Sequence, residues 1–224
     1  MRTALLALAA ALALTPITPA LAAQAAPPTD APPTAAQLKA AVAACTKQVS
    51  NGKYAHDAGG ARTVPVCATR KAVHWRADLD IDCDGQRTAK CNASTDPYWQ
   101  NATAFNQSDG RPLNAETLPF IVVPLASPTW NYRDSGITGG TVAAAVYKDK
   151  VVYGVVGDLG PKAIIGEASY GMARQLGINP HPSTGGVSGA VVDFVVFPGV
   201  KASPIENNAA AVRLGQQAAT ALVS

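Results

Sequence analysis

The stretch RADLDIDCDGQ, residues 76–86, decides how this chain is built. Acidic and apolar residues alternate in it with a period of two, the pattern of a β-strand with one polar and one apolar face. The carboxylates of Asp78, Asp80, Asp82 and Asp84 form the acidic row. Neighbours in such a row lie about 7 Å apart, and each pair costs on the order of 2 kcal/mol at an effective dielectric near 20. Something must offset this repulsion, and three candidates stand open.

Calcium is the first candidate. Asp80, Asp82, Asp84 and Gly85 match the opening of the helix–loop–helix calcium loop, which has acids at positions one, three and five and glycine at six. That loop ends in a bidentate glutamate at position twelve, where this chain has Cys91. The segment before the row also has the pattern of a strand, not of a helix. Calcium at Asp80, Asp82 and Asp84 is therefore an alternative to the main expectation, which is a protein with no metal and no cofactor.

Nearby basic side chains are the second candidate. Arg76, Arg87 and Lys90 are close in sequence and would pair with the row on a solvated surface strand. Some of the aspartates would then simply cap turns around Gly85. On this interpretation the row binds no ligand.

A cationic polymer is the third candidate. A chain of amino sugars carries one ammonium group on each residue, and a row of carboxylates in a cleft would attract it. Asp78, Asp80 and Asp82 would then be substrate-binding residues. Tyr98 and Trp99 follow in the sequence and would pack against sugar rings.

The N-terminal residues have the composition of a secretory signal. Arg2 precedes a short apolar run, and Ala-Leu-Ala at residues 20–22 forms a small-x-small cleavage site. We expect a signal peptide at residues 1–22, a disordered Pro/Ala/Thr-rich linker at residues 23–37 and one folded domain at residues 38–224. The expected mature protein is secreted, extracellular and monomeric, with no membrane contact once the signal is removed.

Charge and motifs exclude several function classes. The formal net charge is +3, and it becomes +2 when Arg2 is removed, because no acid precedes Asp30. With no basic cluster, nucleic acid is not an expected partner. No Gly-Lys-Ser/Thr phosphate loop occurs, and His56, His74 and His181 are scattered outside any nucleophile motif.

The chain has four cysteines, Cys45, Cys67, Cys83 and Cys91. An even number in an exported protein predicts two disulfides, for which three connectivities are possible. We favour the short ring Cys83–Cys91 together with Cys45–Cys67, which loop entropy would stabilise by about 2.5 and 3.5 kcal/mol. A four-cysteine zinc site is the alternative, but no Cys-x-x-Cys pair occurs.

Hydrophobic periodicity and turn residues predict many short strands and few helices. The expected fold is a single disulfide-stabilised domain, mostly β and barrel-like, with the double-psi barrel as one form it could take. The expected helices are at residues 35–49, 168–176 and 208–222, and the expected strands at residues 64–66, 72–81, 120–125, 142–147, 151–156, 163–165 and 190–197.

Four segments together resemble the fungal-type chitosanases of glycoside hydrolase family seventy-five. They are DLDIDCDGQRTAKCN, TDPYWQNATAF, YGVVGDLGP and IIGEASYGMARQLGI, and they occur in the family's order. The alanine-rich leader is typical of a bacterial member. The resemblance implies endo-hydrolysis of the β-1,4 bonds of chitosan with inversion at the anomeric carbon. It also maps the family's two acidic residues onto Asp158 and Glu167.

The residues themselves are suited to this chemistry. An inverting glycosidase needs a protonated acid at the leaving oxygen and a carboxylate that activates water. Glu167 follows an apolar segment, whose burial would raise its pKa and favour the acid role, although a capping role at the next helix would lower it. Asp158 would be the base, facing Glu167 across a hairpin. It could instead be a turn residue, with Asp80 or Asp82 of the acidic row as the base.

A rival function uses the same features without catalysis. An extracellular carbohydrate-binding domain, in a version with or without calcium at the row, would also present carboxylates and aromatic side chains to a polysaccharide. The two hypotheses differ in whether short products are released.

Overall fold

The computed structural model describes residues 31–224. The expected signal peptide and most of the expected linker lie outside these residues. Helix α1 (Ala35–Ala41) begins behind Thr34, which forms a reciprocal capping box with Gln37. Regular structure therefore starts three residues before residue 38, the predicted start of the domain.

Helix α1 is shorter than the predicted helix at residues 35–49. It ends at Ala41, and the following residues become extended, because the Val49 N–H donates to the Val66 carbonyl (2.9 Å). The disulfide Cys45–Cys67 fixes the same segment against the next one. Tertiary pairing here overrides the helical spacing of the apolar residues.

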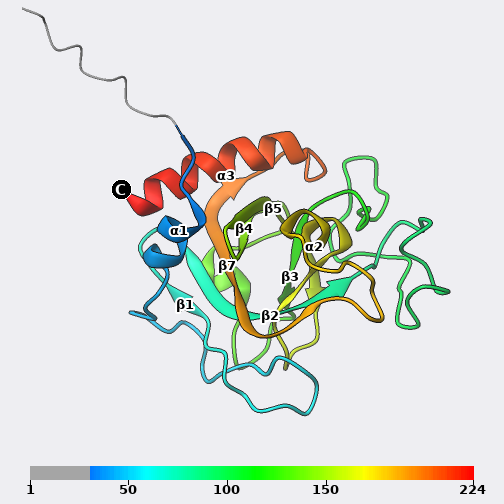
Figure 1. The fold of residues 1–224 in the computed structure, drawn as a ribbon, viewed down its shortest axis with the longest axis horizontal. Coiled ribbons are helices and arrows are strands. Elements are labelled where there is room, and N and C mark those ends of the chain that lie inside the picture. Colours follow the sequence, from blue (N-terminus) through cyan, green and yellow to red (C-terminus); the bar gives the residue numbers. More distant parts are fainter. Residues whose placement is uncertain (1–30) are drawn as a thin grey trace, which may run out of the picture. The chain divides into compact units, whose positions relative to one another are not determined.

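Six strands close into a barrel, with a seventh at one edge (Figure 1). The strands are β1 (Cys67–Ala68), β2 (Val73–Asp82), β3 (Phe120–Pro124), β4 (Thr141–Tyr147), β5 (Lys150–Gly160), β6 (Glu167–Ser169) and β7 (Val187–Lys201). Their order is β1-β2-β6-β3-β5-β4-β7, and β7 pairs back onto β2 to close the barrel. The predicted mostly-β, barrel-like domain is confirmed. Two of the pairs, β2–β6 and β3–β5, are parallel.

Helices cover parts of this barrel. Helix α2 (Tyr170–Leu176) directly follows β6, and a short 3-10 helix lies at Tyr132–Ser135. Helix α3 (Asn208–Val223) lies along the outside of the strands (Figure 1). Its Gly215 packs against the Tyr153 ring. Within residues 31–224, no helix is both long and apolar enough to cross a membrane.

The alternating stretch forms the second half of β2, as its period predicts. Trp75, Ala77 and Leu79 are buried in the barrel interior, where the Trp75 ring stacks on Phe194 with centroids 5.5 Å apart. The aspartates at even positions consequently lie on the outer face of the barrel. The apolar half of the pattern thus provides core, and the acidic half provides a surface.

Two predicted strands are wrong: residues 64–66 form only an isolated bridge at Val64, and the error at residues 163–165 matters for the site. Residues 163–165 form a loop that pairs with Ala55, through Ala55 N–H to the Ala163 carbonyl and Ile165 N–H to the Ala55 carbonyl (both 3.1 Å). The strand itself is β6, which begins at Glu167. The three apolar residues are placed by contact with a distant segment rather than by sheet pairing of their own.

The favoured disulfide pairing is confirmed. Cys83–Cys91 joins the residue after β2 to the following loop, and Cys45–Cys67 joins the segment after α1 to β1. All four cysteines of the chain are used. The Cys83–Cys91 disulfide holds the end of the aspartate row in place.

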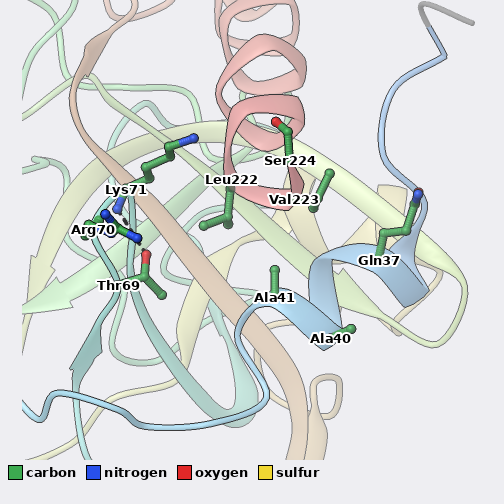
Figure 2. A pocket seen from close by; sticks show the side chains of 9 residues that line it. All are labelled: Gln37, Ala40, Ala41, Thr69, Arg70, Lys71, Leu222, Val223 and Ser224. Carbon is green, nitrogen blue, oxygen red and sulfur yellow. Dashed lines mark hydrogen bonds between the residues drawn. The ribbon is translucent and has the colours of Figure 1, made fainter.

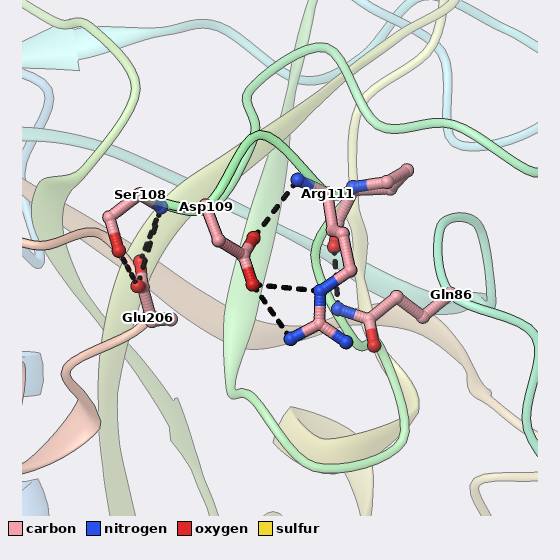
Figure 3. A network of polar contacts seen from close by, with 6 residues as sticks. Gln86, Ser108, Asp109, Arg111 and Glu206 are labelled. Carbon is pink, nitrogen blue, oxygen red and sulfur yellow. Dashed lines mark hydrogen bonds and ion pairs between the residues drawn. The ribbon is translucent and has the colours of Figure 1, made fainter.

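The polar segment after Cys91 is tied to the rest of the domain by side chains (Figure 3). Glu206, just before α3, accepts hydrogen bonds from the Ser108 backbone and hydroxyl. Arg111 pairs with Asp109 at 2.7 Å, and the Gln86 amide donates to a backbone carbonyl of the same segment (2.8 Å). The segment that carries Tyr98 and Trp99 is therefore anchored at both ends.

Candidate active site

Four carboxylates meet at an open cleft on the outer face of the barrel. Asp82 comes from β2, Asp84 follows that strand, Asp158 comes from β5, and Glu167 begins β6. We call these four residues the cleft cluster. The cleft has a volume of about 470 Å³ and is also lined by Asp96. A concave site with several carboxyl groups favours a cationic ligand or a reaction that needs proton transfer.

Strand register explains why the cluster forms. In the parallel pair β2–β6, Asp80 lies opposite Glu167, and in the parallel pair β3–β5, Val122 lies opposite Asp158. Strand β3 therefore lies between Glu167 and Asp158. The predicted hairpin across the turn after Asp158 is wrong, because β6 pairs with β2 and β3 and not with β5. The two acids still converge, from strands that are not neighbours.

Glu167 has the environment of a protonated acid. Burial, and after it the negative charges of Asp158, Asp80, Asp84 and Asp96 in that order of size, together raise its pKa to about 8. Its side chain accepts no hydrogen bond from residues 31–224, so no donor opposes these effects. The capping role is excluded, because the N-cap of α2 is Ser169, whose hydroxyl accepts from the Met172 N–H. The carboxyl is free to act in the cleft.

Asp158 has the environment of an oriented carboxylate. Its Oδ1 accepts hydrogen bonds from the Ala104 and Leu159 backbone N–H groups, both at 2.7 Å. Burial raises the pKa of Asp158, and these two hydrogen bonds oppose that rise. Such donors fix the orientation of the group and favour its charged form. Asp158 is thus the member of the cluster with two donors aimed at one oxygen.

Asp82 and Asp84 complete the cluster. Burial raises the pKa of Asp82 well above its usual value, and the charges of Glu167, Asp158 and Asp84 add to the rise. The Asp84 N–H donates to Asp82 at 2.6 Å, and Asp84 itself accepts from the Gln100 N–H at 2.6 Å. Burial is also the main reason that the pKa of Asp84 is raised to about 6. Near neutral pH the cluster holds protons that isolated carboxyls would lose.

The first half of the aspartate row has different neighbours. His56 Nδ1 lies 3.0 Å from Asp78 Oδ1, and the Asp78 carboxyl is buried. Asp57, Asp78 and Asp80 bring carboxylate oxygens within 4.8 Å of one another. We call His56, Asp57, Asp78 and Asp80 the histidine cluster. His56 was missed from the sequence, since nothing in a loop residue 22 positions before Asp78 signals this contact.

The candidate calcium ligands do not come together as predicted. Among the described residues, Asp82 and Asp84 group with Asp158, whereas Asp80 groups with Asp57 and Asp78. The helix–loop–helix spacing therefore does not translate into one shared site on this strand. The pairing of the strands sets which acidic groups lie next to each carboxylate.

The basic side chains near the row do not neutralise it. Arg76 pairs with Asp193 of β7, at 3.9 Å, and not with any aspartate of the row. Within residues 31–224, neither Arg87 nor Lys90 forms an ion pair. The interpretation of the row as a salt-bridged surface strand is therefore wrong. The repulsion is relieved by raised pKa values and by His56 instead.

The two aromatic candidates differ in position. Tyr98 is 84% exposed and lines the cleft together with Leu125, which is 41% exposed. Trp99 is half-buried and packs against the outer hydrophobic cluster of the barrel. Tyr98 and Leu125 are the only large hydrophobic side chains exposed on the described part of the chain. Their place beside the carboxylates marks the cleft as a binding surface.

A larger cavity, of about 720 Å³, lies between α1, the turn before β2 and the end of α3 (Figure 2). Arg70 and Lys71 line it, and the Lys71 ammonium donates to the Ala221 carbonyl. It shares no lining residue with the acidic cleft. Its basic character makes it a poor match for a cationic polymer.

An open cleft with a proton-holding carboxyl beside an oriented carboxylate is the arrangement that glycosidic bond hydrolysis uses. A sequence profile described as the fungal chitosanase of glycosyl hydrolase group 75 matches residues 79–220. The match covers more than half of the chain, including β2 from Leu79 onward and the whole cleft cluster. The chain belongs to this family.

Individual relatives agree with the family match. The chain is 30% identical to endo-chitosanase C of Aspergillus oryzae over 177 residues, which are 75% of this chain and 43% of that protein. It is 35% identical to endo-chitosanase B of the same species over 103 residues, 43% of each chain. An endo-chitosanase of Aspergillus fumigatus is 27% identical over 150 residues, 61% of this chain and 63% of that protein. The chain thus spans less than half the length of the first two relatives.

Proposed function

We propose that this protein is an endo-acting glycoside hydrolase that cleaves the β-1,4 bonds of chitosan with inversion. The observation that carries the proposal is the pairing of Glu167, whose pKa is raised to about 8, with the hydrogen-bonded Asp158 in one acidic cleft. Family membership and the names of the relatives support the same substrate. The proposed roles are general acid for Glu167 and general base for Asp158.

Glu167 would donate its proton to the glycosidic oxygen as the bond from that oxygen to C1 breaks. The raised pKa keeps this proton in place at neutral pH, so the group is ready when substrate arrives. Asp158 would take a proton from a water molecule, whose oxygen forms the new bond to C1 from the opposite side. Each turnover leaves Glu167 ionised and Asp158 protonated, and exchange with solvent restores both.

The strand order supports inversion. Neighbouring strands lie about 4.8 Å apart, so β6 and β5, which flank β3, have backbones about 10 Å apart. Inverting glycosidases hold their carboxyls about 6.5–9.5 Å apart to admit a water, whereas retaining enzymes hold them about 5–5.5 Å apart. Backbones two spacings apart leave room for the wider separation, and Glu167 reaches across β3, since its Oε2 lies 3.0 Å from where a Cβ on Gly160 of β5 would be. A pair on adjacent strands would have suited the narrower one.

Chitosan is the proposed partner because it carries an ammonium group on each deacetylated unit. Asp80 presents an exposed carboxylate on β2, and Tyr98 offers an exposed ring in the same region, whereas Asp82 is buried and its raised pKa makes it a weaker partner for an ammonium group. Asp78, the other predicted substrate contact, is buried against His56. We expect Asp80→Asn to weaken the binding of deacetylated oligomers more than that of acetylated ones. Equal losses for both would argue against ammonium recognition.

The deciding experiment is incubation with defined glucosamine oligomers. Mass analysis should show shorter oligomers, and proton NMR of the first products should show the new reducing end as the α-anomer. A β-anomer would remove the inverting mechanism. Retention on chitosan with no release of short products would instead indicate a binding domain. Addition of EDTA tests the calcium version, which predicts a lower melting temperature without the ion.

Export is part of the proposal. The expected signal peptide lies outside the described residues, but two disulfides are typical of an oxidising compartment outside the cytoplasm. An extracellular enzyme also meets a polymer too large to enter a cell. Recovery of the processed protein from culture medium, with an N-terminus near residue 23, tests this point.

A further inference from the structure

The histidine cluster lies directly behind the residue that we propose as the general acid. His56 Nδ1 is 3.0 Å from Asp78 Oδ1 and 3.2 Å from the Asp78 backbone nitrogen. The ring nitrogen can donate to the carboxylate or accept from the N–H, so it holds Asp78 in either tautomer. The pair is buried on the Asp78 side, with 5% of that side chain exposed against 22% of His56.

Asp78 in turn defines the backbone just before Glu167. Gly166 has a φ of +123°, and a Cβ at this position would overlap Asp78 Oδ1 and touch Ala77. The Gly166 carbonyl accepts a hydrogen bond from the Asp80 N–H at 2.8 Å. The chain therefore enters β6 pressed against the Asp78 carboxylate, in a conformation that only glycine adopts easily.

A second contact holds the same turn from the other side. The Ala55 backbone, next to His56, pairs with residues 163–165 through two hydrogen bonds of 3.1 Å. A cavity of about 10 Å³, lined by His56, Asp80, Gly166 and Glu167 among others, is all the space left between these groups. The loop before Glu167 is thus enclosed by residues 55–56 on one side and β2 on the other.

We propose that His56 and Asp78 are positioning residues that hold the Gly166–Glu167 segment, and so the Glu167 carboxyl, in its place in the cleft. This inference rests on the proposed function, in which Glu167 must meet the glycosidic oxygen. A displacement of about 1 Å in such a group can cost about 100-fold in rate. Neither residue contacts the cleft itself, so both act through Glu167.

The first test compares kinetic constants of His56→Ala and Asp78→Ala with those of wild type. We expect kcat on glucosamine oligomers to fall by about 10- to 100-fold while KM stays within about twofold, because substrate contacts are not removed. Matched controls are His74→Ala and Asp193→Ala, a buried histidine and a buried aspartate of β2 and β7 that line neither the cleft nor the small cavity. The controls should keep kcat.

The second test is the pH profile. Glu167 faces Asp158, Asp80, Asp84 and Asp96, and its pKa is raised first by burial. Without the contacts of His56 and Asp78, water reaches the Glu167 carboxyl and its pKa falls. The basic limb of the kcat profile should therefore move to lower pH. The side of the cluster facing His56 also holds Asp57 and Asp80, which are unchanged in both variants. A loss of general stability alone would lower activity without moving this limb.

The third test is rescue. His56→Asn can place an amide near the Nδ1 position, whereas His56→Gln places it near Nε2, so Asn should keep most of kcat and Gln should not. This pair decides the question even if His56→Ala fails to fold. The His56→Gln/Asp78→Ala double variant should lose no more than the worse single variant, since the two act as one unit.

Several results would overturn the inference. The first is that folded His56 and Asp78 variants keep both kcat and the basic limb of the pH profile, or show a raised KM at constant kcat. The second is that His74→Ala or Asp193→Ala loses as much kcat as they do. The third is equal activity of His56→Asn and His56→Gln. These outcomes differ from failure of the proposed function, in which wild type leaves the oligomers intact or Glu167→Gln remains active. The positioning role alone would be rejected if wild type is active, Glu167→Gln is inactive, and the His56 and Asp78 variants behave like wild type.

Discussion

The two halves of the aspartate row have the same spacing on the same chain, yet they have different roles in the folded protein. In the histidine cluster, Asp78 is paired with His56 and packed against Gly166. In the cleft cluster, Asp82 has Glu167, Asp158 and Asp84 as its charged neighbours. One half thus has a base to offset its charge, and the other has only more acids.

Neighbouring groups set the chemistry of otherwise identical aspartate side chains. Carboxylates that crowd together without a base must keep protons, so their pKa values rise. Burial also raises the pKa of Asp78, but the hydrogen bond and charge of His56 oppose that rise and hold the carboxyl as a rigid support. The cleft cluster is therefore suited to proton transfer, and the histidine cluster to holding the backbone of Glu167.

Glu167→Gln removes one ionisable carboxyl from the cleft cluster and should have the largest effect on activity. The amide cannot donate the proton to the leaving oxygen, so the hydrolysis rate should fall by about 100- to 10,000-fold. Release of reducing ends from chitosan measures it. Glu116→Gln, an isosteric change outside the cleft, is the control and should be near wild type. Retained activity in Glu167→Gln would refute its role as the acid.

Asp158→Asn should come second, at about 100-fold or more. Its amide oxygen can keep the hydrogen bonds from Ala104 and Leu159, so the fold should survive while the base is lost. Asp193→Asn in β7 is the matched control. If Asp158→Asn stayed within about threefold of wild type, the base would have to be another carboxylate, with Asp82 or Asp80 next in line.

The pKa of Glu167 also makes a prediction about stability. Its ordinary value is 4.5, and burial raises the pKa to about 8 in the folded protein. Between these values only the folded state holds the proton, so stability falls as pH rises, by about 1.4 kcal/mol for each pH unit. Glu167→Gln cannot ionise and escapes this loss.

Its melting temperature should therefore match that of wild type near pH 4 and exceed it by about 10 °C or more at pH 8. Differential scanning calorimetry across this range measures the difference. Asp80 and Asp84 titrate in both proteins, so their contributions largely cancel. A constant difference between pH 4 and pH 8 would mean that Glu167 is not held protonated.

Asp80→Asn changes the member of the histidine cluster whose charge also acts on Glu167 of the cleft cluster. The Asp80 charge is one of the groups that raise the pKa of Glu167, so its removal should lower that pKa. The basic limb of the kcat/KM profile should then move to lower pH, with a modest change in rate at the optimum. Asp57→Asn, which is not among the groups acting on Glu167, should leave the limb in place. The same shift in both variants would contradict the assignment.

Tyr98→Ala should have the smallest effect. An exposed ring at the cleft contributes about 0.5–1.5 kcal/mol to packing against a sugar, which corresponds to an increase in KM of about 3- to 10-fold with little change in kcat. Tyr98→Phe should behave like wild type if the ring face is what matters. A normal KM in Tyr98→Ala would place the polymer elsewhere in the cleft.

Local pattern was enough to predict the strands that build the barrel. The period of two in residues 76–86 correctly predicted a strand with an apolar face opposite the aspartates, and Leu79 on that face is buried in the barrel. It failed at residues 163–165, where three apolar residues resemble a strand but pair only with Ala55. Short apolar runs are ambiguous because their periodicity is the same in a strand and in a buried loop.

The candidate acids were identified by resemblance and chemistry, but their geometry was not. A hairpin between Asp158 and Glu167 was the simple expectation for neighbours in sequence. The parallel pairing of β6 with β2 instead brings Glu167 beside Asp80, and β3 separates it from Asp158. Register between strands depends on contacts made across the whole barrel, which no local pattern contains.

The alternating residues alone were enough to give one strand an acidic face and an apolar face, because side chains alternate along any extended chain. The cysteine spacing left three connectivities open, and the favoured one is the one that the structure has. Only the tertiary structure decided which aspartates would meet a histidine and which would meet other acids. That choice depends on loops and strands far apart in the chain, and burial among those neighbours sets each carboxyl's affinity for protons.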